Sequence, residues 1–249
     1  MPSGRGRRRR TRSTAGRRRQ GGGDVSHFTL HRHARAKKAA RAEFDQWAGG
    51  YDRSLLQRFL FRPSHDMILS EIDLGGSPRI LDVGCGTCVF GFRISAISPS
   101  SEIFCVDLSH EMARKANAKR NCMPRLAGRP GAVRITLADS DHLPFSDGSV
   151  DYVTCANSFH HYPHPEGVLR EMHRVLRPGG KAIVVDGCRD TLPGRLIFDL
   201  IVTLAEGDVR HLSAGAFKDL FARCGFGRIR QKTHLLGIPI LLTAAVAEK

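Results

Sequence analysis

Two short segments of the sequence carry residues whose types and spacing suit the binding of a nucleoside. The first, Arg79 to Thr87, reads RILDVGCGT and places a glycine turn directly after an apolar strand. Glycine has no Cβ, so Gly84 and Gly86 let the backbone approach a ligand closely. The second segment ends in Asp107, whose carboxylate can accept hydrogen bonds from both hydroxyls of a ribose. Together they predict a nucleoside-cofactor site at the carboxyl edge of a parallel sheet.

The surrounding sequence predicts the scaffold that this site needs. Short apolar strands alternate with helices, a pattern typical of a parallel sheet covered on both faces. The strands are expected at 79–83, 102–106, 133–138, 151–156, 181–186, 228–235 and 240–248. The helices between them are expected at 88–97, 109–121, 165–176, 195–205 and 213–224. The last two strands have only a short link, so an antiparallel hairpin should complete a doubly wound α/β sheet of seven strands.

The N-terminal part differs from this body in composition. Residues 1–41 carry 14 Lys and Arg against one acidic residue, whereas residues 42–249 carry 25 against 23. The net charges are therefore +13 and +2, and the basicity belongs to the N-terminal part. We expect a disordered Arg/Gly-rich tail over 1–26. A helical cap over 27–78, with a joint at Gly49–Gly50, and the α/β domain over 79–249 should follow.

The basic tail leaves several interpretations open. It could hold RNA or an anionic membrane surface by salt-dependent contacts. It could equally be a solvated extension, or residues upstream of the natural start codon. It lacks the amphipathic face of a mitochondrial transit peptide, and the chain has neither a signal-peptide core nor an apolar run that could span a bilayer. We therefore expect a cytoplasmic protein with no transmembrane segment, and the oligomeric state stays open.

The seven cysteines are scattered, and most fall in apolar stretches where cysteine acts as a small hydrophobe. Cys85 and Cys88 do form a Cys-x-x-Cys motif. Zinc would need two more ligands at suitable spacing, and because the sequence has no second pair, no metal site is predicted. A redox-active pair remains the alternative for this motif.

Four ordered segments resemble the class I S-adenosylmethionine-dependent methyltransferases. The closest branch contains the ubiquinone/menaquinone-biosynthesis C-methyltransferases, the methyltransferase type 11 domain. The segments are Ile80–Thr87, Phe104–Ser109, Ala138–Asp147 and Asn157–Gly180. The resemblance runs from about Phe44 to the end of the chain. It implies a Rossmann-like fold, S-adenosyl-L-methionine as the cofactor, and a methyltransferase that acts by in-line displacement.

The resemblance also implies which residues bind the cofactor, all near the carboxyl ends of strands. Asp82 would receive the ammonium group, Gly84 and Gly86 would pass beneath the methionine part, and Asp107 would bind the ribose. The full set is Asp82, Gly84, Gly86, Thr87, Asp107, Leu108, Met112, Asp139, Ser140, Asn157 and Ser158.

Within that set, Leu108 and Met112 would pack on the adenine. The carboxylate of Asp139 would accept from the adenine amine, and the backbone amide after it, at Ser140, would donate to a ring nitrogen. Asn157 and Ser158 would lie beside the sulfonium.

The turn departs from its relatives at one place, where Cys88 replaces a usual third glycine. We expect cofactor binding to survive with altered geometry. A nicotinamide-dependent dehydrogenase is the main chemical rival, but its fingerprint requires a glycine where this chain has Val89.

The sequence predicts the residues around the methyl acceptor in less detail than those around the cofactor. His160 and His161 are the candidate bases, since histidine titrates near neutral pH; Tyr162, His164 and Asp186 are nearby alternatives. The two histidines could instead only shape the pocket wall. The acceptor should enter between the helices of Phe44–Phe59 and an apolar insertion over 195–212, with Trp47 and Tyr51 closing over the cofactor. Leu196–Leu204 could equally be a core helix.

An apolar and aromatic lining favours a small hydrophobic or planar acceptor. Three other functions stay open: an RNA methyltransferase recruited through the tail, a non-catalytic cofactor-binding protein, and an arsenic methyltransferase.

Overall fold

The computed structural model describes residues 60–123, 133–197, 211–235 and 238–249, together with Arg35, Lys37, Lys38, Arg41, Ala42 and Asp45. Trp47, Tyr51, the tail and most of the insertion lie outside the described residues. The proposed division into tail, cap and domain therefore stays a prediction. Within the described part of the chain, none of the helices has the length and apolarity needed to cross a membrane.

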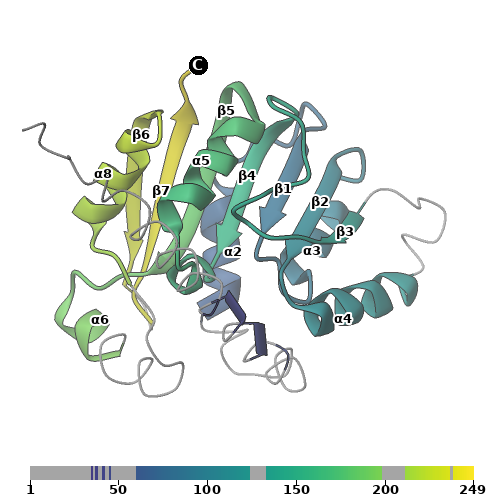
Figure 1. The fold of residues 1–249 in the computed structure, drawn as a ribbon, viewed down its shortest axis with the longest axis horizontal. Helices are drawn as coiled ribbons and strands as arrows, with labels where there is room; N and C mark the ends of the chain where they lie inside the picture. Colours follow the sequence, from purple (N-terminus) through teal and green to yellow (C-terminus); the bar gives the residue numbers. More distant parts are fainter. Residues whose placement is uncertain are drawn as a thin grey trace, which may run out of the picture.

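A single sheet of seven strands forms the centre of the molecule (Figure 1). The strands lie in the order β3-β2-β1-β4-β5-β7-β6, and β7 is antiparallel to both of its neighbours. Their bounds are β1 Arg79–Val83, β2 Glu102–Asp107, β3 Val133–Leu137, β4 Val150–Ala156, β5 Leu176–Gly187, β6 Phe226–His234 and β7 Ile240–Ala247. The sheet confirms the expected fold, which is mostly parallel with a C-terminal antiparallel pair.

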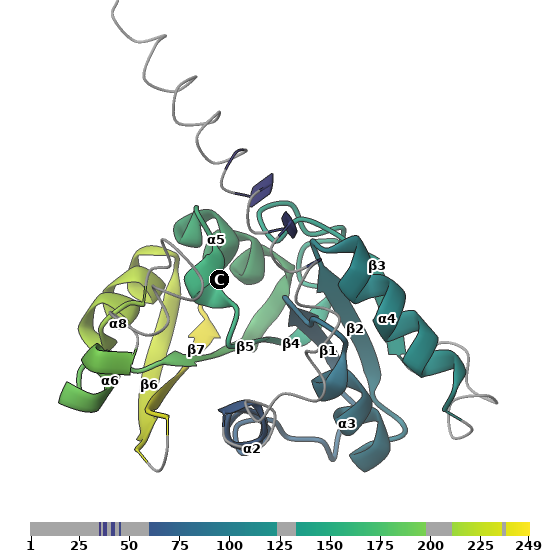
Figure 2. The same cartoon turned by 90° about the horizontal axis from the view of Figure 1, so that it is seen from below.

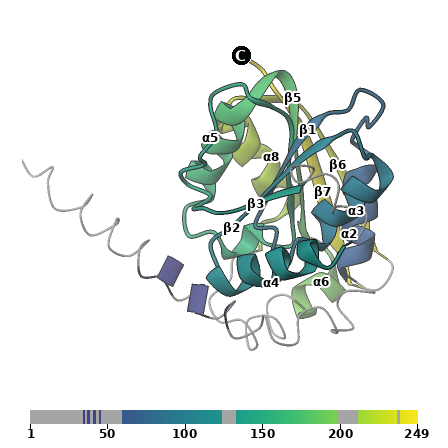
Figure 3. The same ribbon diagram turned by 90° about the vertical axis from the view of Figure 1, so that its right-hand side faces the viewer.

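Helices cover both faces of this sheet, as Figures 2 and 3 show. Ile68 of α2 and Phe90 of α3 pack in one apolar core, whereas Leu169 of α5 and Phe221 of α8 pack in the other. The helices are α2 Arg62–Leu69, α3 Val89–Ile97, α4 His110–Asn121, α5 Pro165–Val175, α6 Leu192–Leu196 and α8 Ala214–Arg223, with a 3-10 turn, η4, at Phe159–His161.

Local sequence explains why these elements begin where they do. The hydroxyl of Ser109 accepts the Met112 N–H at 3.1 Å and caps α4, and Ser213 caps α8 in the same way. The four residues of β1 after Arg79 are all buried, as expected for a central strand covered on both faces. After the buried Phe226, β6 instead alternates half-buried and exposed residues up to Lys232, because it lies at the edge of the sheet.

Two elements differ from the sequence expectations. β5 begins at Leu176, five residues before its predicted start, because the buried Leu176 pairs with Val150 and the strand is irregular before Lys181. α6 begins at Leu192, three residues before the predicted helix, because Thr191 accepts the Gly194 N–H at 3.0 Å and caps it. Most of that predicted helix, residues 198–205, lies outside the described residues.

Candidate active site

A cavity of about 810 Å³ lies at the carboxyl ends of the parallel strands, a size in the usual range for small-molecule sites. β1 pairs with β2 on one side and with β4 on the other, so the strand order reverses at β1. Such a reversal leaves a crevice above the strand ends. The residues around the cavity are Lys37, Val83, Gly84, Gly86, Val106, Asp107, Leu108, Met112, Ala138, Asp139, Ser140, Asp141, Ala156, Asn157, Ser158, His161, Tyr162, Pro163 and Val168.

The cavity brings together every predicted cofactor residue except Asp82 and Thr87. Those two line a smaller adjoining cavity of about 330 Å³, which shares Gly84 and Ala156 with the larger one. Gly84 therefore separates a larger compartment from a smaller one, and the predicted set is divided between them.

The close packing of the glycine turn against the cavity wall requires a glycine at position 84, because there is no room for a side chain there. The residue has a φ of +70°, and a Cβ there would lie 2.3 Å from the Ser158 Oγ and 2.7 Å from the Tyr162 hydroxyl oxygen. The Gly84 and Cys85 amides donate to the Val106 carbonyl at 2.9 and 3.1 Å. These bonds hold the turn against the end of β2. The side of Gly84 that lacks a side chain faces Ser158 and Tyr162 of the cavity wall.

Asp107 ends β2 and is held by backbone amides. One carboxylate oxygen accepts the Gly86 N–H at 2.7 Å, and the other accepts the Ser109 N–H at 2.8 Å. Burial raises the pKa of this carboxyl group, and the two amides oppose that rise. The same carboxylate also lines the cavity, so its remaining lone pairs can accept from a ligand there.

Lys37 and Asp141 line the cavity but are absent from the set predicted from the sequence. Lys37 Nζ lies 2.8 Å from Asp139 and 2.5 Å from Asp141, and all three residues line the cavity. Burial lowers the pKa of Lys37, but the two carboxylates outweigh burial and raise it. No sequence signal distinguishes Lys37 from the other cations of its basic stretch.

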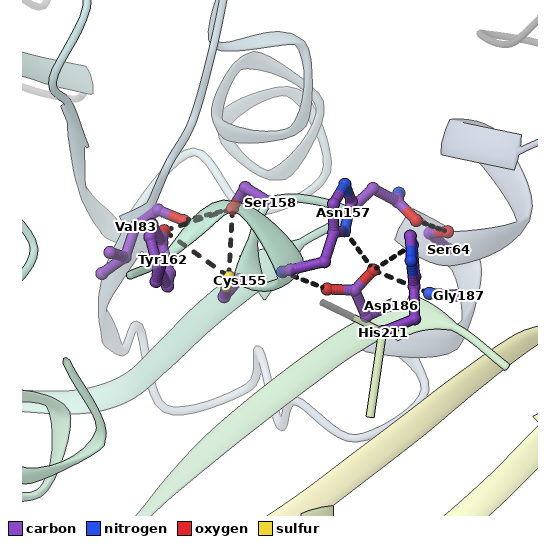
Figure 4. A network of polar contacts seen from close by, with 10 residues as sticks. Ser64, Val83, Cys155, Asn157, Ser158, Tyr162, Asp186, Gly187 and His211 are labelled. Atoms are coloured by element: carbon purple, nitrogen blue, oxygen red, sulfur yellow. Dashed lines mark hydrogen bonds and ion pairs between the residues drawn. The ribbon is translucent and has the colours of Figure 1, made fainter. Parts of the chain in front are cut away.

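Asn157 and Ser158 lie where β4 ends, beside the glycine turn. The Asn157 Oδ1 accepts from the Ser64 hydroxyl at 3.2 Å, and Ser158 Oγ lies 3.2 Å from the Tyr162 hydroxyl (Figure 4). The Asn157 Nδ2 is buried and has no hydrogen-bond partner within the described part of the chain. A buried donor without a partner is costly, and this one belongs to a residue of the cavity wall.

Asp82 is a buried carboxyl group, with only 2% of its surface exposed. Burial raises its pKa to about 8, although the Thr154 hydroxyl donates to it at 2.8 Å and opposes that rise. The group is therefore largely protonated at neutral pH until a cation approaches it.

His160, Asp186 and His211 form a cluster at the end of β5. The His160 Nδ1 lies 2.6 Å from Asp186 Oδ1, the His160 amide donates to Asp186 Oδ2 at 2.9 Å, and His211 Nε2 lies 4.0 Å from Oδ1. Figure 4 shows Asp186 beside His211 and Gly187. Burial raises the pKa of Asp186, but the facing histidines outweigh it and hold the pKa below its usual range.

His161 lines the cavity and packs on His160, with ring centroids 4.1 Å apart. Burial, with the neighbouring His160 adding to it, lowers the pKa of His161 to about 2, so this ring is neutral. His160 does not line the cavity and stands behind His161.

The cluster carries donor types that transition metals use, and its three donor atoms lie within 4.8 Å of one another. The 2.6 Å separation of His160 and Asp186 is the length of a hydrogen bond. Ligands of one tetrahedral zinc ion stand about 3.3 Å apart, as zinc–nitrogen bonds of about 2 Å require. The cluster is therefore arranged to hold a proton.

Known proteins resemble the chain in sequence and in fold. Residues 81–184 match the family model described as a methyltransferase domain. A demethylmenaquinone methyltransferase of Staphylococcus carnosus is 30% identical over 192 residues, which span 69% of this chain and 77% of that protein. The ubiquinone/menaquinone biosynthesis C-methyltransferase UbiE of Geotalea uraniireducens is 34% identical over 146 residues, 57% of this chain and 60% of that one.

Among solved structures, a Thermotoga maritima protein described as an S-adenosylmethionine-dependent methyltransferase, possibly acting on histamine nitrogen, superposes with a TM-score of 0.66. It is 20% identical and covers 82% of this chain and 98% of its own. That likeness shows the fold, and the matches in sequence show the family. The strand order of the seven-stranded sheet, which reverses at β1, and the glycine turn beside Asp107 agree with these matches. This chain belongs to the class I S-adenosylmethionine-dependent methyltransferases.

Proposed function

We propose that the two adjoining cavities together hold S-adenosylmethionine, with its nucleoside in the larger one and its methionine end in the smaller one. Asp107 accepts from the ribose hydroxyls, and Leu108 and Met112 pack on the adenine. Asp139 and Ser140 contact the adenine edge, where Lys37 shares the Asp139 carboxylate. The bare Gly84 supports this assignment, because a Cβ there would fill the junction of the two cavities.

At the methionine end, Gly86 and Thr87 lie along the methionine part of the cofactor, and Asp82 contacts its ammonium group. Burial of Asp82 makes that contact strong, since the interior screens charge weakly. Asn157 and Ser158 lie beside the sulfonium, and the Asn157 Nδ2 gains the partner that it lacks among the described residues. The cofactor supplies a methyl group on a charged leaving group; the protein aligns the acceptor and excludes water.

We infer that the acceptor is a small, planar, apolar molecule that loses a proton when it is methylated. The observation that carries this inference is the buried His160–Asp186 pair behind the cavity wall. A methyl acceptor that keeps its protons needs no base, whereas a phenol- or quinol-type ring must lose one. The named relatives support the same class, because they act on demethylmenaquinone.

The proton would leave through the two adjacent imidazoles. His161 faces the cavity and meets the acceptor first, but its pKa of about 2 prevents it from keeping a proton at neutral pH. His160 packs against it, and the Asp186 carboxylate stabilises its protonated ring. We therefore assign His161 as the catalytic residue that contacts the acceptor and His160 as the group behind it that holds the proton.

The acceptor class is tested by comparing substrates of different chemistry. We would incubate the full chain with S-adenosylmethionine and, in parallel, a reduced demethylmenaquinone analogue, a single-ring phenol, an aliphatic amine and a short RNA. Methyl transfer to the planar diol or phenol, detected by mass spectrometry, is the expected result. Transfer confined to the amine or the RNA would contradict the proposal.

Asp186→Asn should lower kcat by roughly 100-fold, the usual contribution of a positioned base, while the KM for S-adenosylmethionine changes little. The pH profile of kcat should lose its acidic limb, because His160 no longer has an anion to hold its proton. His160→Asn should have a similar effect, and the double variant should be no worse than either single one. His234→Asn, on the edge strand β6, is the matched control. An unchanged pH profile in Asp186→Asn would remove the pair from the mechanism.

Deleting residues 1–23 separates the small-molecule proposal from RNA recruitment by the tail. Turnover of a small acceptor should be unchanged, and any RNA binding by the full chain should fall as basic residues are lost. Both are measured directly, by methyl transfer and by an RNA titration at two salt concentrations. If turnover itself depended on the tail and on added RNA, RNA would replace the small molecule as the proposed acceptor.

A further inference from the structure

We propose that Cys88 and Cys105 are a modification site, at which a hydroperoxide forms a disulfide beneath the glycine turn. The Cys-x-x-Cys motif pairs Cys85 with Cys88 in sequence, but the structure brings Cys105 of β2 against Cys88. Their sulfur atoms lie 3.0 Å apart, and both residues are completely buried. The proposed effect on the cofactor rests on the site assigned above, whereas the bond itself does not.

The packing around the two sulfurs is built to hold them together. Gly91 lies one helical turn after Cys88 in α3, where glycine costs helix stability. A Cβ at Gly91 would lie 2.6 Å from the Cys105 sulfur and 2.8 Å from the Cys88 sulfur. The space that an alanine side chain would need is thus occupied by the pair.

The backbone at Cys88 is also unusual for a side chain of this kind. Cys88 caps α3 with a φ of 63° and a ψ of 27°, the left-handed conformation that favours glycine. Its side chain makes no capping hydrogen bond. A cysteine in this position carries a conformational cost, and what it places in the core is a sulfur atom next to Cys105.

The environment of Cys88 favours the reactive thiolate. Hydrogen bonds from Cys105 and Cys85 lower the pKa of the Cys88 thiol, burial opposes them, and the positive charge of Lys119 lowers it further. The thiolate is the nucleophilic form of cysteine. Among the three thiols, Cys85 is only half-buried and lines the smaller cavity together with Thr87 and Val89, the chain neighbours of Cys88. Because the Cys85 side chain contacts both Cys105 and Cys88, the proposed route for the oxidant runs from the smaller cavity past Cys85.

The chemistry needs one hydroperoxide per disulfide. The Cys88 thiolate attacks a peroxide oxygen, the O–O bond breaks, and the departing oxygen takes a proton and leaves as water when the oxidant is hydrogen peroxide. Cys105 sulfur then attacks the sulfur of the resulting sulfenic acid, the S–O bond breaks, and the Cys105 proton leaves with the hydroxyl group as a second water. Two electrons pass from the sulfur atoms to the peroxide.

The disulfide would affect the cofactor site because both cysteines are close in sequence to residues of that site. A disulfide bond of about 2.05 Å draws the two sulfurs together by about 1 Å. Cys88 follows the turn that contains Gly86, and Cys105 stands two residues before Asp107 on β2. The Gly86 amide donates to Asp107 at 2.7 Å, so movement of the turn against β2 alters the geometry around the ribose carboxylate. We therefore expect weaker cofactor binding in the oxidised protein.

The test treats the full chain with hydrogen peroxide and maps its disulfides by mass spectrometry without reduction. A peptide pair joined through Cys88 and Cys105 is the expected product, and reduction with dithiothreitol should remove it. Calorimetric titration with S-adenosylmethionine should give a dissociation constant roughly tenfold higher for the oxidised protein, a loss of about 1.4 kcal/mol in binding free energy. Reduction should restore the original value.

Two variants and one control make the result specific. Cys105→Ala should form no such bond and should keep its cofactor affinity after peroxide. Cys88→Gly should do the same, and glycine suits the backbone there if the first variant fails to fold. Cys122→Ser removes an exposed thiol at the end of α4 and should respond to peroxide like the parent.

A bond between Cys85 and Cys88, or oxidation of Cys122 while Cys88 and Cys105 stay reduced, would overturn the proposal. Because the mapping needs no activity, a protein that forms the bond but binds no S-adenosylmethionine would contradict the cofactor assignment and leave the modification site standing.

Discussion

Replacing Asp107 by alanine should weaken S-adenosylmethionine binding by about 100-fold or more. The proposed contacts are two hydrogen bonds from the ribose to one charged group, and each such bond contributes about 1.5–3 kcal/mol. The same change leaves the Gly86 and Ser109 amides without their acceptor, so the turn loses its support as well. Calorimetric titration measures the affinity, and thermal unfolding in the absence of cofactor reports whether the fold survives.

Asp219→Ala is the matched control for this prediction. Asp219 is an exposed carboxylate on α8, a helix that packs beside β6 and contributes no residue to either cavity. Its removal should leave affinity and unfolding temperature unchanged. If Asp107→Ala folded normally and bound the cofactor as tightly as the parent, the ribose assignment would be wrong.

Asp82→Asn should stabilise the protein without cofactor and weaken cofactor binding at the same time. The folded pKa of Asp82 is about 8 and its ordinary value is 3.8, so the folded state keeps a proton that the unfolded state has lost. Stability therefore falls as pH rises from about 4 toward about 8, because the buried group must ionise or hold an extra proton. Asparagine keeps the shape without that penalty.

The unfolding temperatures of the parent and of Asp82→Asn should nearly coincide at about pH 3.5 and separate increasingly up to about pH 8.5. Each kcal/mol of added stability corresponds to about 2–4 °C for a chain of this size. Binding should change in the opposite direction, with a loss of roughly tenfold to 100-fold as the ammonium loses its anion. Equal affinity of the two proteins would exclude Asp82 from the methionine end. Asp219→Asn, at the exposed position on α8, should alter neither measurement.

Much of the fold follows from local patterns that survive in a single sequence. The strands of the parallel part are continuous apolar runs, because both faces of the sheet are covered, and their ends are marked by glycine or polar residues. The start of β5 was misplaced because Pro178, Gly179 and Gly180 suggest a turn, whereas Leu176 gains its burial by pairing with Val150. Such pairing depends on a partner strand more than twenty residues away.

The convergence of most predicted cofactor residues on one cavity has a related reason. In a parallel sheet, the carboxyl ends of β1, β2 and β4 meet at one edge, so residues that follow these strands converge whatever the lengths of the helices between them. Gly84, Asp107 and Asn157 needed only their strands to be assigned. The predicted acceptor side lacks this regularity: the sequence offers His160 and His161 as equal candidates, and the structure shows that His161 lines the cavity whereas His160 does not.

By itself, the sequence determined the order of strands and helices, the glycine turn and the carboxylates at the strand ends, because each of these depends on residues close together in the chain. Only the tertiary structure decided which side chains face each other across elements. Lys37 meets Asp139 from 102 positions away, His211 approaches Asp186, and the sulfur of Cys105 lies 3.0 Å from that of Cys88. Those contacts arise because separate helices, strands and loops pack together, and a local pattern in the sequence does not predict which of their residues meet.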